Sequence, residues 1–411
     1  MRKINCMPSR SNFVTDTLFT NLAIVFDRAS FYGLRSFLVV YLMSGDSHFT
    51  EEEALYFYAA LTFAFSFARL IGGVISDFVL GTRWGAIAGA ALHTVGFLLL
   101  NSTVKPLIFC GFALLVAGSG LTTSSLYART GRLYLSKKEK MDGAFALNFT
   151  AVNVGSFAVA LIFPFIVMDT KYQTVFYILA AFAFSGMLMS FFLSDDTRET
   201  SHVSIDQPTL EKPSLSYGHA KIVLLLFCLA ALNWFFSGIG ARFTNDHIGQ
   251  IGKGMLTGIT SASMAVIEIL LVITWFFVRM NTFLKLALGA AMMGLTYLLL
   301  PSFLNAAGIS ITPVAVVLII SMTGEHILLT LTPSAIARYT NPRYMGTVLG
   351  GLSLLAGLVL TYLSDAIGVL TTIPMDLVLA GLGLTALSIV LYVYHKRPEK
   401  NMIEEQHPDS L

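Results

Sequence analysis

Long apolar runs separated by short polar segments fill most of the chain, and they predict membrane-spanning helices. The runs are continuous, whereas the strands of a membrane barrel would alternate between apolar and polar positions. One crossing takes about 20 apolar residues, and the sequence accommodates twelve crossings. We expect them at residues 16–43, 53–79, 84–101, 106–133, 143–168, 173–193, 220–245, 254–278, 283–303, 311–338, 344–367 and 375–395.

A polar segment with serine, proline and charged residues follows the sixth run and divides the helices into two sets of six. Its composition is that of a flexible linker. We predict an N-terminal six-helix bundle over residues 1–193, a linker over 194–218, a second six-helix bundle over 219–395 and a cytoplasmic tail over 396–411. The fold class is therefore all-α, with two pseudo-symmetric bundles as in many secondary transporters. Twelve helices without internal symmetry are the alternative.

Composition agrees with a polytopic membrane protein. Hydrophobic residues make up 55% and charged residues 12% of the 411 positions, which is about half the charged fraction of a soluble domain. Of the 26 lysines and arginines, four lie well inside the expected spans, three lie in loops of one side, and the others lie on the side of both termini. The positive-inside rule then predicts cytoplasmic termini, in a plasma membrane or a bacterial inner membrane. The basic N-terminus precedes a run too long and too charged for a signal peptide, so we expect a retained first helix.

Several function classes are disfavoured by the sequence. The basic residues form no clustered patch for nucleic acid, and the three cysteines have no disulfide or metal-site spacing. Neither a Walker sequence nor a nucleophile elbow is present, which argues against an ATP-driven pump and against an enzyme. We expect no cofactor or metal, and the partners that we predict are the lipid bilayer, a small-molecule substrate and protons, with the chain as a monomer.

The stretch Leu22–Leu42, LAIVFDRASFYGLRSFLVVYL, places three charges in an otherwise apolar run. Each charge costs at least about 2.5–3.5 kcal/mol at membrane depth, so such residues usually face a partner or a substrate path. Helical spacing puts Arg28, Tyr32 and Arg35 on one stripe. Asp27 projects about 100° away from Arg28, so we expect that it does not simply face Arg28. A structural ion pair of Asp27 and Arg28 with a neighbouring helix is the alternative to a functional role.

Two further acids, Glu268 in the eighth span and Glu325 in the tenth, lie deep in apolar runs. A buried carboxylate can gain and lose a proton as its surroundings change, so both are candidates for proton coupling or, alternatively, structural acids. His93 and His326 lack a second metal-type ligand at a suitable spacing, and we expect hydrogen-bonded core histidines. Interior arginines exceed interior acids by one when Arg242 in the seventh span is counted, which favours a substrate with an anionic group.

Between the second and third spans, Gly73, Asp77, Gly81 and Arg83 follow the pattern Gly-x3-Asp-x3-Gly-x-Arg. This pattern resembles the signature loop of the major facilitator superfamily, in the place where that family carries it. The resemblance implies the major facilitator fold, with the acid holding a neighbouring helix in one state. An acid is also electrostatically favourable at a helix N-terminus. We expect Asp77, with Arg83, to stabilise one conformation without touching the substrate.

A narrower resemblance, to the proton-dependent oligopeptide transporter family, covers the first, second, fourth, fifth and tenth spans. The positions that match are Asp27, Arg28, Phe31, Tyr32, Gly33, Arg35, Gly118, Gly120, Leu121, Asn153, Gly155, Glu325 and Gly346. The chain departs from that family where Ile24 replaces an acid, Thr123 a lysine and Arg69 a proline. Losing one acid and one base leaves the charge unchanged but removes the cation that the family uses for a peptide carboxylate. Arg69 is a candidate to supply that charge.

The resemblance implies a proton-coupled symporter that imports a small peptide or amino-acid-like solute by alternating access. The residues expected to bind this substrate are Arg28, Tyr32, Arg35, Arg69, Thr123, Phe149, Asn153 and Glu325. The residues expected to couple protons are Asp27, Arg28, Glu268 and Glu325. Of these, Arg28 and Arg35 would hold a carboxylate and Glu325 an amine, while Asp27 would carry the proton.

Asp246, near the outer end of the seventh span, is a candidate partner of Arg35 in an outer gate. Two alternatives to peptide transport stay open. The first is a major facilitator transporter of another small organic substrate, such as an organic anion, a nucleoside or a drug-like molecule, which the missing lysine favours. The second is a membrane sensor that does not transport, which the buried charges disfavour.

Overall fold

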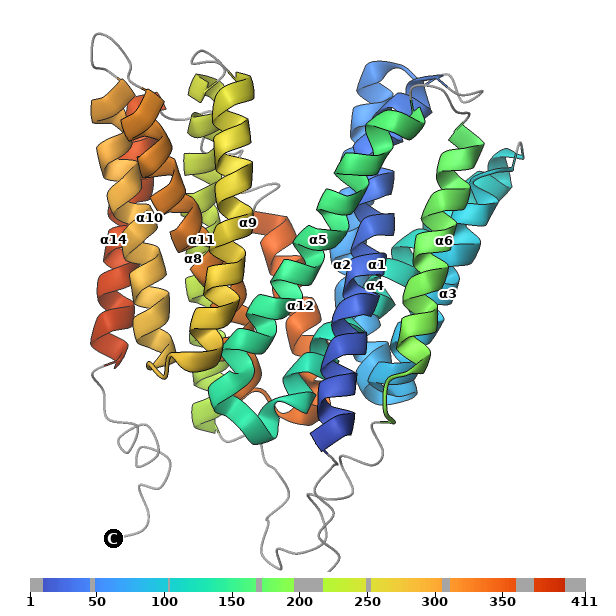
Figure 1. Ribbon diagram of the computed structural model, residues 1–411, viewed down its shortest axis with the longest axis horizontal. Helices are drawn as coiled ribbons and strands as arrows, with labels where there is room; N and C mark the ends of the chain where they lie inside the picture. The colour runs from blue at the N-terminus through green and yellow to red at the C-terminus, as the bar shows by residue number, and fades with distance from the viewer. Residues whose placement is uncertain are drawn as a thin grey trace, which may run out of the picture. The chain divides into compact units, whose positions relative to one another are not determined.

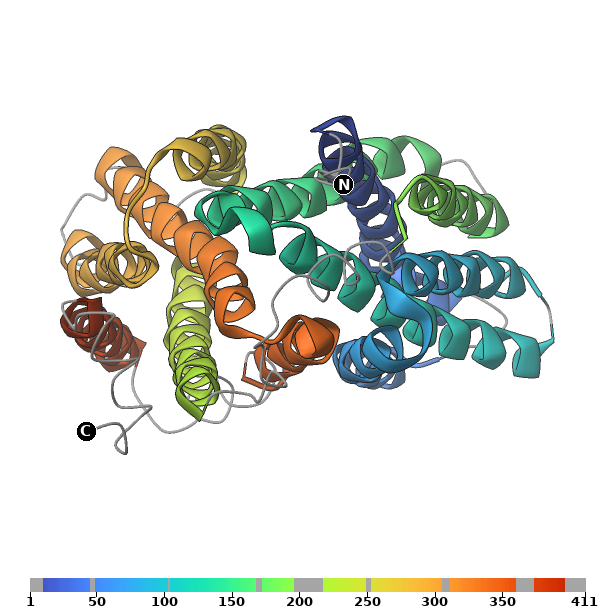
Figure 2. The same cartoon turned by 90° about the horizontal axis from the view of Figure 1, so that it is seen from below.

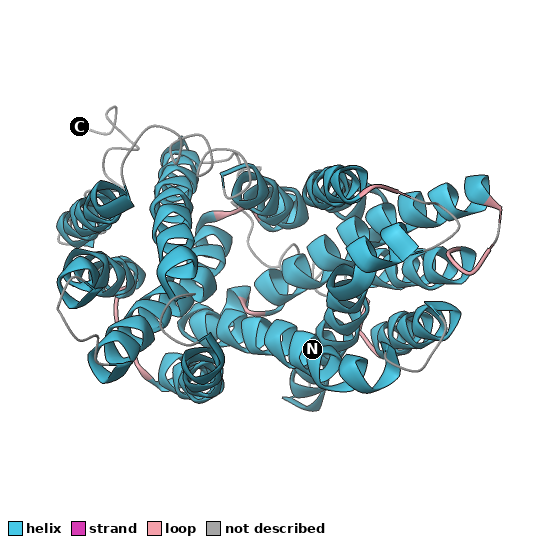
Figure 3. Cartoon of the chain, turned by 90° about the horizontal axis from the view of Figure 1, so that it is seen from above, coloured by secondary structure: helices cyan, strands magenta, loops and turns pink. Residues whose placement is uncertain are grey.

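The computed structural model describes residues 10–44, 49–102, 104–167, 172–195, 217–248, 253–304, 311–359 and 373–395, and the regular elements in these ranges are all helical (Figures 1 and 3). Side chains near several helix ends, including those of residues 239–248, lie outside the description. The α-helices are α1 (Arg10–Ser44), α2 (Glu51–Ile75), α3 (Gly81–Leu99), α4 (Lys105–Leu133), α5 (Met141–Val167), α6 (Tyr172–Phe191), α8 (Tyr217–Ile248), α9 (Lys253–Phe277), α10 (Thr282–Leu304), α11 (Ile311–Tyr339), α12 (Met345–Leu358) and α14 (Ile373–His395). A π-helical turn η1 (Ser76–Leu80) and two 3-10 turns, η2 (Leu135–Lys140) and η3 (Pro342–Tyr344), join some of them.

The all-helical prediction is confirmed, and the chain is a multi-pass membrane protein. Seven segments of the described residues are long and apolar enough to cross a membrane, and two shorter apolar helices accompany them. The charged helix α1 is not among the seven. Helix ends differ from the expected spans because hydropathy locates only the apolar middle of a helix. Thus α1 begins at Arg10 instead of residue 16, and α3 begins at Gly81 instead of residue 84.

Local signals in the sequence explain where helices begin. Thr50 precedes α2 and forms a capping box with Glu53, in which the Thr50 hydroxyl accepts from the Glu53 N–H and the Glu53 carboxylate accepts from the Thr50 N–H. Pro106 stands in the first turn of α4, where its missing N–H has no helical partner to lose. Both signals can be recognised from the sequence alone.

The helices group into two compact units. The first unit contains Met1–Ser136, Leu147–Ser214 and Asn341–Leu354, and the second contains Lys137–Ala146, Leu215–Thr340 and Leu355–Leu411. Each unit therefore includes one short segment that belongs, by sequence, to the other half of the chain. Lys137–Ala146 includes the beginning of α5, and Asn341–Leu354 includes the beginning of α12.

In the first unit, α3 packs on α4 and α6, α2 packs on α4, and α1 packs on α4 and α6 (Figure 2). Leucines and phenylalanines make up most of the buried cluster between these helices, with Phe31, Phe37, Phe65, Phe97 and Phe176 each 4% exposed or less. In the second unit, α10 packs on α11 and α14, and α11 packs on α8 and α9. The polar side chains described below interrupt these apolar interfaces.

Glycines allow α2 and α4 to approach closely. A Cβ atom added to Gly120 would overlap the backbone carbonyl of Ala68, and one added to Gly72 would overlap the backbone of Gly120. Such small-residue contacts are common between membrane helices, because they let backbones pack against each other.

We expect Gly120→Ala to lower the free energy of unfolding by about 1–3 kcal/mol, since the new methyl group meets backbone that cannot move aside. Gly186→Ala is the matched control, because its nearest neighbour would be the Phe26 Cβ at 3.4 Å, an ordinary contact. Thermal unfolding of the two purified variants in detergent measures the difference. Equal stability of the two variants would contradict the close packing of α2 on α4.

Candidate substrate and coupling sites

Asp27 and Arg28 form a buried ion pair in the middle of α1. The Arg28 Nε and Nη2 atoms donate to Asp27 Oδ2 at 3.0 and 2.7 Å, and the two residues are 4% and 3% exposed. The expectation that Asp27 would not face Arg28 is wrong. The two Cα–Cβ bonds diverge as expected, but the arginine side chain is long enough to turn back to its neighbour. Arg28 Nη2 also donates to the Thr123 hydroxyl of α4, which ties α1 to α4.

Three guanidinium groups surround the ring of Phe31. The Cζ atoms of Arg28, Arg35 and Arg69 lie 5.0, 5.7 and 5.7 Å from the ring centroid. Cation–π attraction of this kind stabilises each cation by about 0.5–2 kcal/mol. It does not cancel the repulsion between like charges in one buried region. The arrangement therefore concentrates positive charge on one part of the first unit.

Arg69 is the least satisfied of the three. Its Nε atom is buried and makes no hydrogen bond to any described residue. It lies within electrostatic range of Arg28, which repels it, and of the Tyr32 and Tyr127 hydroxyl groups. A buried donor without an acceptor is unfavourable by about 1–3 kcal/mol, and by more when the group is charged. An anion bound here would satisfy it.

Arg35, about two helical turns beyond Arg28 on α1, has a neutral partner. Its Nε atom donates to the Tyr58 hydroxyl of α2 at 2.9 Å, and its Cζ atom lies 5.2 Å from the centroid of the Tyr58 ring. The expected gate partner, Asp246, has a side chain outside the described residues, as has Arg242. The outer gate therefore stays a prediction.

His93 of α3 approaches the other oxygen of Asp27. Its Nδ1 atom lies 3.3 Å from Asp27 Oδ1, and the histidine is 2% exposed. The predicted burial of this core histidine is confirmed, and Asp27 Oδ1 is the polar atom of the described residues that lies nearest to its Nδ1 atom, which has no other hydrogen-bond partner among them. No pattern within one helix could have indicated the pair, since the two residues lie on different helices.

A second pair of carboxylate and imidazole lies in the other unit. His326 Nε2 of α11 is 3.3 Å from Glu268 Oε1 of α9, and His326 Nδ1 is 2.8 Å from the carbonyl oxygen of Met322. A carbonyl oxygen only accepts, so Nδ1 carries a hydrogen. Glu325, beside His326, is half-buried. The prediction of a hydrogen-bonded core histidine is confirmed for His326, which is 2% exposed, and Glu268 is a carboxylate neighbour that the sequence did not indicate.

The other expected substrate residues keep their predicted helices. Ile24, at the position of the missing acid, is 2% exposed and packs in an apolar cluster with Ala86 and Leu126. Phe149 and Asn153 are half-buried on α5. Their contact with a substrate stays a prediction. Among the described residues, no three His, Cys, Asp or Glu side chains gather as metal ligands.

Asp77 caps the N-terminus of α12. Its carboxylate accepts from the backbone N–H groups of Gly346 and Thr347 at 3.0 and 2.6 Å and from the Thr347 hydroxyl at 2.8 Å. It also accepts from Arg132 Nη2 at 2.7 Å. Asp77 lies in the π-helical turn η1, and Gly81 ends that turn with a φ of 77°, a conformation that favours glycine.

Arg83, the other conformational residue expected from sequence, pairs with an acid other than Asp77. Its Nη1 atom donates to Asp195 at 2.6 Å, and its Nη2 atom donates to the carbonyl of Phe191 at 3.0 Å. Arg132, at the end of α4, is the cation that pairs with Asp77. Sequence inspection missed it because arginines near the cytoplasmic ends of helices are common and look alike.

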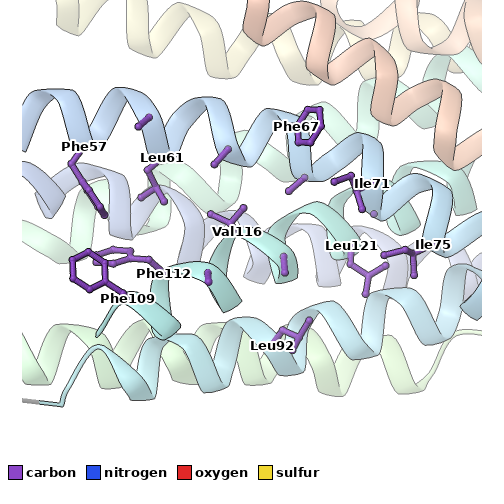
Figure 4. Close-up of a pocket in the computed structure, with 16 residues that line it drawn as sticks. Phe57, Leu61, Phe67, Ile71, Ile75, Leu92, Phe109, Phe112, Val116 and Leu121 are labelled. Carbon is purple, nitrogen blue, oxygen red and sulfur yellow. The ribbon is translucent and has the colours of Figure 1, made fainter. Parts of the chain in front are cut away.

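The pocket in Figure 4 is a different feature from this charged region. It has a volume of about 600 Å³ and lies between α2, α3 and α4, and its lining is entirely apolar, with Phe57, Phe112, Val116 and Leu121 among the residues. Such a lining offers no hydrogen-bonding or charged group to a polar solute. The charged residues of α1 and their partners are the better candidate for a substrate site.

Apolar helices that enclose ion pairs define a polytopic membrane protein with a charged interior, a combination typical of proteins that move solutes. The chain belongs to the Major Facilitator Superfamily, whose sequence model matches residues 20–359. The signature residues Gly73, Asp77, Gly81 and Arg83 lie within this match.

Known proteins similar to this chain include peptide permeases. Dipeptide and tripeptide permease A of Proteus mirabilis is 29% identical over 170 residues, which are 40% of this chain and 33% of that protein. The match thus spans about a third of that relative's length. A solved proton dependent oligopeptide transporter has a TM-score of 0.60 at 16% identity, over 96% of this chain and 100% of that one. The human organic anion transporter MFSD10 has a TM-score of 0.67 at 15% identity, over 95% and 99%. These structures share the fold.

Proposed function

We propose that this protein is a secondary transporter that imports a small peptide or amino-acid-like solute with protons, by alternating access. The observation that carries the proposal is the excess of positive charge around Phe31. Asp27 is the only carboxylate of the described residues that contacts Arg28, Arg35 or Arg69. A carboxylate on the substrate would neutralise this excess and accept from Arg69 Nε.

The other parts of the proposal rest on the family and on charge. The permease from Proteus mirabilis is named for dipeptides and tripeptides, which supports a peptide as the first substrate to test. Glu325, in the second unit, is the proposed partner of the substrate amine. Asp77 with Arg132 would hold α12 in one conformation of the transport cycle. The positive-inside count supports cytoplasmic termini in the plasma membrane, or in the inner membrane of a bacterium.

Ligand-induced thermal stabilisation of the purified protein tests the proposal. A ligand that binds only the folded state adds RT ln(1 + [L]/Kd), which is about 2.7 kcal/mol at 100 times Kd. We expect stabilisation by dialanine and related dipeptides, with single amino acids as the comparison. A panel in which no peptide stabilises the protein would contradict peptide transport.

Arg69→Ala should weaken dialanine binding roughly tenfold to a hundredfold, because a hydrogen bond to a charged group contributes about 1.5–3 kcal/mol. Arg279→Ala is the matched control, since Arg279 is exposed beyond the end of α9 and its loss changes the net charge equally. Isothermal titration or stabilisation curves provide the two affinities. If Arg69→Ala bound dialanine as the Arg279→Ala variant does, the proposed anion site would be wrong.

A second candidate function is transport of an organic anion without an amine. Thr123 favours it, because the hydroxyl accepts from Arg28 where the resemblance expects a lysine for the peptide carboxylate. Glu325→Gln distinguishes the candidates. A peptide transporter should lose affinity for dialanine in this variant, whereas binding of a simple carboxylate such as benzoate should be unaffected. Stabilisation of the wild type by benzoate and not by dialanine would select the second candidate.

A further inference from the structure

A buried carboxylate oxygen and a buried imidazole nitrogen face each other in the first unit, and neither has another hydrogen-bond partner among the described residues. Asp27 of α1 is 3% exposed and His93 of α3 is 2% exposed. Asp27 Oδ1 and His93 Nδ1 lie 3.3 Å apart, and neither atom is hydrogen-bonded to any described residue. Buried polar atoms are nearly always satisfied in folded proteins. Two such atoms in contact therefore indicate a hydrogen between them.

The hydrogen belongs to the imidazole. The second oxygen of Asp27 accepts two hydrogen bonds from Arg28, at 3.0 and 2.7 Å, which favours the ionised carboxylate. An ionised carboxylate can only accept, so His93 Nδ1 must donate. In the neutral imidazole this leaves Nε2 with a free lone pair. Nε2 is then the atom at which a second proton can bind.

The surrounding helices hold the ring in this orientation. A Cβ atom added to Gly118 of α4 would lie 2.8 Å from the His93 backbone nitrogen and 3.0 Å from His93 Cδ2. Helix α4 therefore packs closely against the histidine. The ring of Phe97 lies 6.0 Å away on the same helix as His93. The imidazole is thus placed between α4 and the acid of α1.

The charges nearby make a proton at His93 sensitive to an anion. The charged or titratable residues around the pair, on α1, α2 and α4, are Asp27, Arg28, Tyr32, Arg69 and Tyr127. Helix α6 also packs on α1 and α3, but its Tyr172 packs against Tyr41 and its Tyr177 is 57% exposed. With a neutral imidazole, Asp27 balances Arg28 and leaves Arg35 and Arg69 in excess. A protonated imidazole adds a further uncompensated positive charge.

We propose that His93 is the residue that binds the coupling proton, at Nε2, with Asp27 as its counter-ion, and that this proton and an anionic substrate at Arg28 and Arg69 promote each other's binding. The proton adds to the Nε2 lone pair and leaves from it, and no other bond changes. Coupling between two ligands is reciprocal, so substrate binding draws a proton in and proton binding raises the substrate affinity. The inference rests on the proposed function for its substrate, and it transfers the proton from Asp27, our expectation from sequence, to His93.

Imidazole NMR of the full-length protein tests proton binding without any substrate. The protein, purified in detergent with 15N-labelled histidine, has eight histidines, and the His93 signals are those missing in His93→Asn. As the pH is lowered from about 9 to about 5, we expect His93 Nε2 to change from an unprotonated to a protonated nitrogen. At a given pH, saturating dialanine should increase the protonated fraction. A His93 signal that keeps one protonation state over the whole range would overturn the proposal.

Substitutions at His93 distinguish proton binding at Nε2 from the structural contact between Nδ1 and Asp27. His93→Asn retains an N–H donor at the Nδ1 position and removes Nε2, and His93→Gln serves as a second variant if the first does not fold. In the wild type, dialanine affinity should fall about tenfold per pH unit above the titration range, as one coupled proton requires. In His93→Asn the affinity should be independent of pH, and an imposed pH gradient should no longer drive uptake, while exchange of labelled dialanine continues. Unchanged pH dependence in both variants would overturn the role of His93.

The failure of this inference can be told from the failure of the proposed function. If dialanine binds the wild type at no pH, peptide transport is wrong, and the NMR titration of His93 still decides whether the residue takes up a proton. If dialanine binds but His93 does not titrate, the transporter proposal stands and the proton site is wrong.

Discussion

Replacing Asp142 with alanine is expected to lower the free energy of unfolding by about 3–5 kcal/mol, the effect of removing one partner from a buried ion pair. Asp142 lies in the first turn of α5 and is 1% exposed. Its carboxylate accepts from Lys285 Nζ at 2.6 Å, from the Ser334 hydroxyl at 2.6 Å and from Arg338 Nη2 at 2.7 Å. Without the acid, two cations would face each other with no counter-ion among their described contacts.

Lys285 makes the loss severe because it is only 2% exposed, and its Nζ atom lies 4.7 Å from the centroid of the Trp275 ring. The ring attracts the ammonium group but does not replace a carboxylate. A double variant, Asp142→Ala with Lys285→Met, should therefore recover part of the stability, because it removes the stranded charge and keeps an apolar side chain of similar length.

Thermal unfolding in detergent measures these differences, with Asp195→Ala as the control. Asp195 pairs with Arg83 at 2.6 Å, but its side chain is 44% exposed, and exposed pairs contribute about 1 kcal/mol or less. Similar destabilisation in Asp142→Ala and Asp195→Ala would show that burial does not determine the effect. A double variant less stable than Asp142→Ala would show that the unpaired charge of Lys285 is not what destabilises the single variant.

Asp77→Ala is the second substitution with a large expected effect, about 3–5 kcal/mol in stability together with loss of uptake. It removes the cap of α12, in which the carboxylate accepts from two backbone N–H groups, and the buried pair with Arg132 at 2.7 Å. Asp77→Asn should have an intermediate effect. The amide oxygen can still accept from α12, but it cannot neutralise Arg132.

The partner of Asp77 is tested by comparing two arginine variants. Arg132→Ala should resemble Asp77→Ala in stability and in uptake of labelled dialanine into proteoliposomes, because it leaves the acid without its cation. Arg83→Ala should change stability by about 1 kcal/mol or less, since Arg83 pairs with an exposed acid. If Arg83→Ala had the larger effect, the pairing of Asp77 with Arg132 would not be the functional one.

Much of the fold could be read from the sequence, because hydropathy reports a local property. Apolar runs of sufficient length must be helical in a membrane, since backbone groups there have no water to bind. The charges of α1 were evident for the same reason, as they interrupt an apolar run. Gly81 of the signature loop was also evident from the sequence pattern, and its positive φ is a conformation that favours glycine.

The contacts of those charges could not be read from the sequence. Helical periodicity gives the direction of a Cα–Cβ bond but not the path of a long side chain, which is why Arg28 reached Asp27 against expectation. Periodicity also does not identify the neighbouring helix, so His93 looked like an ordinary core histidine. Asp142, Lys285 and Arg338 lie at the ends of apolar runs, where charged residues usually meet water, and nothing in the sequence marked them as buried together.

The sequence by itself determined that this is an all-helical, multi-pass protein with the major facilitator signature and three costly charges in its first helix, because each of these is a property of one segment. The tertiary structure alone decided that Asp27 lies between Arg28 and His93, that Arg69 joins Arg28 at Phe31, and that Asp77 caps a helix 270 positions away. These are contacts between segments, and their energies depend on distance and burial. The distances and the burial of these side chains are determined only when the helices pack against one another.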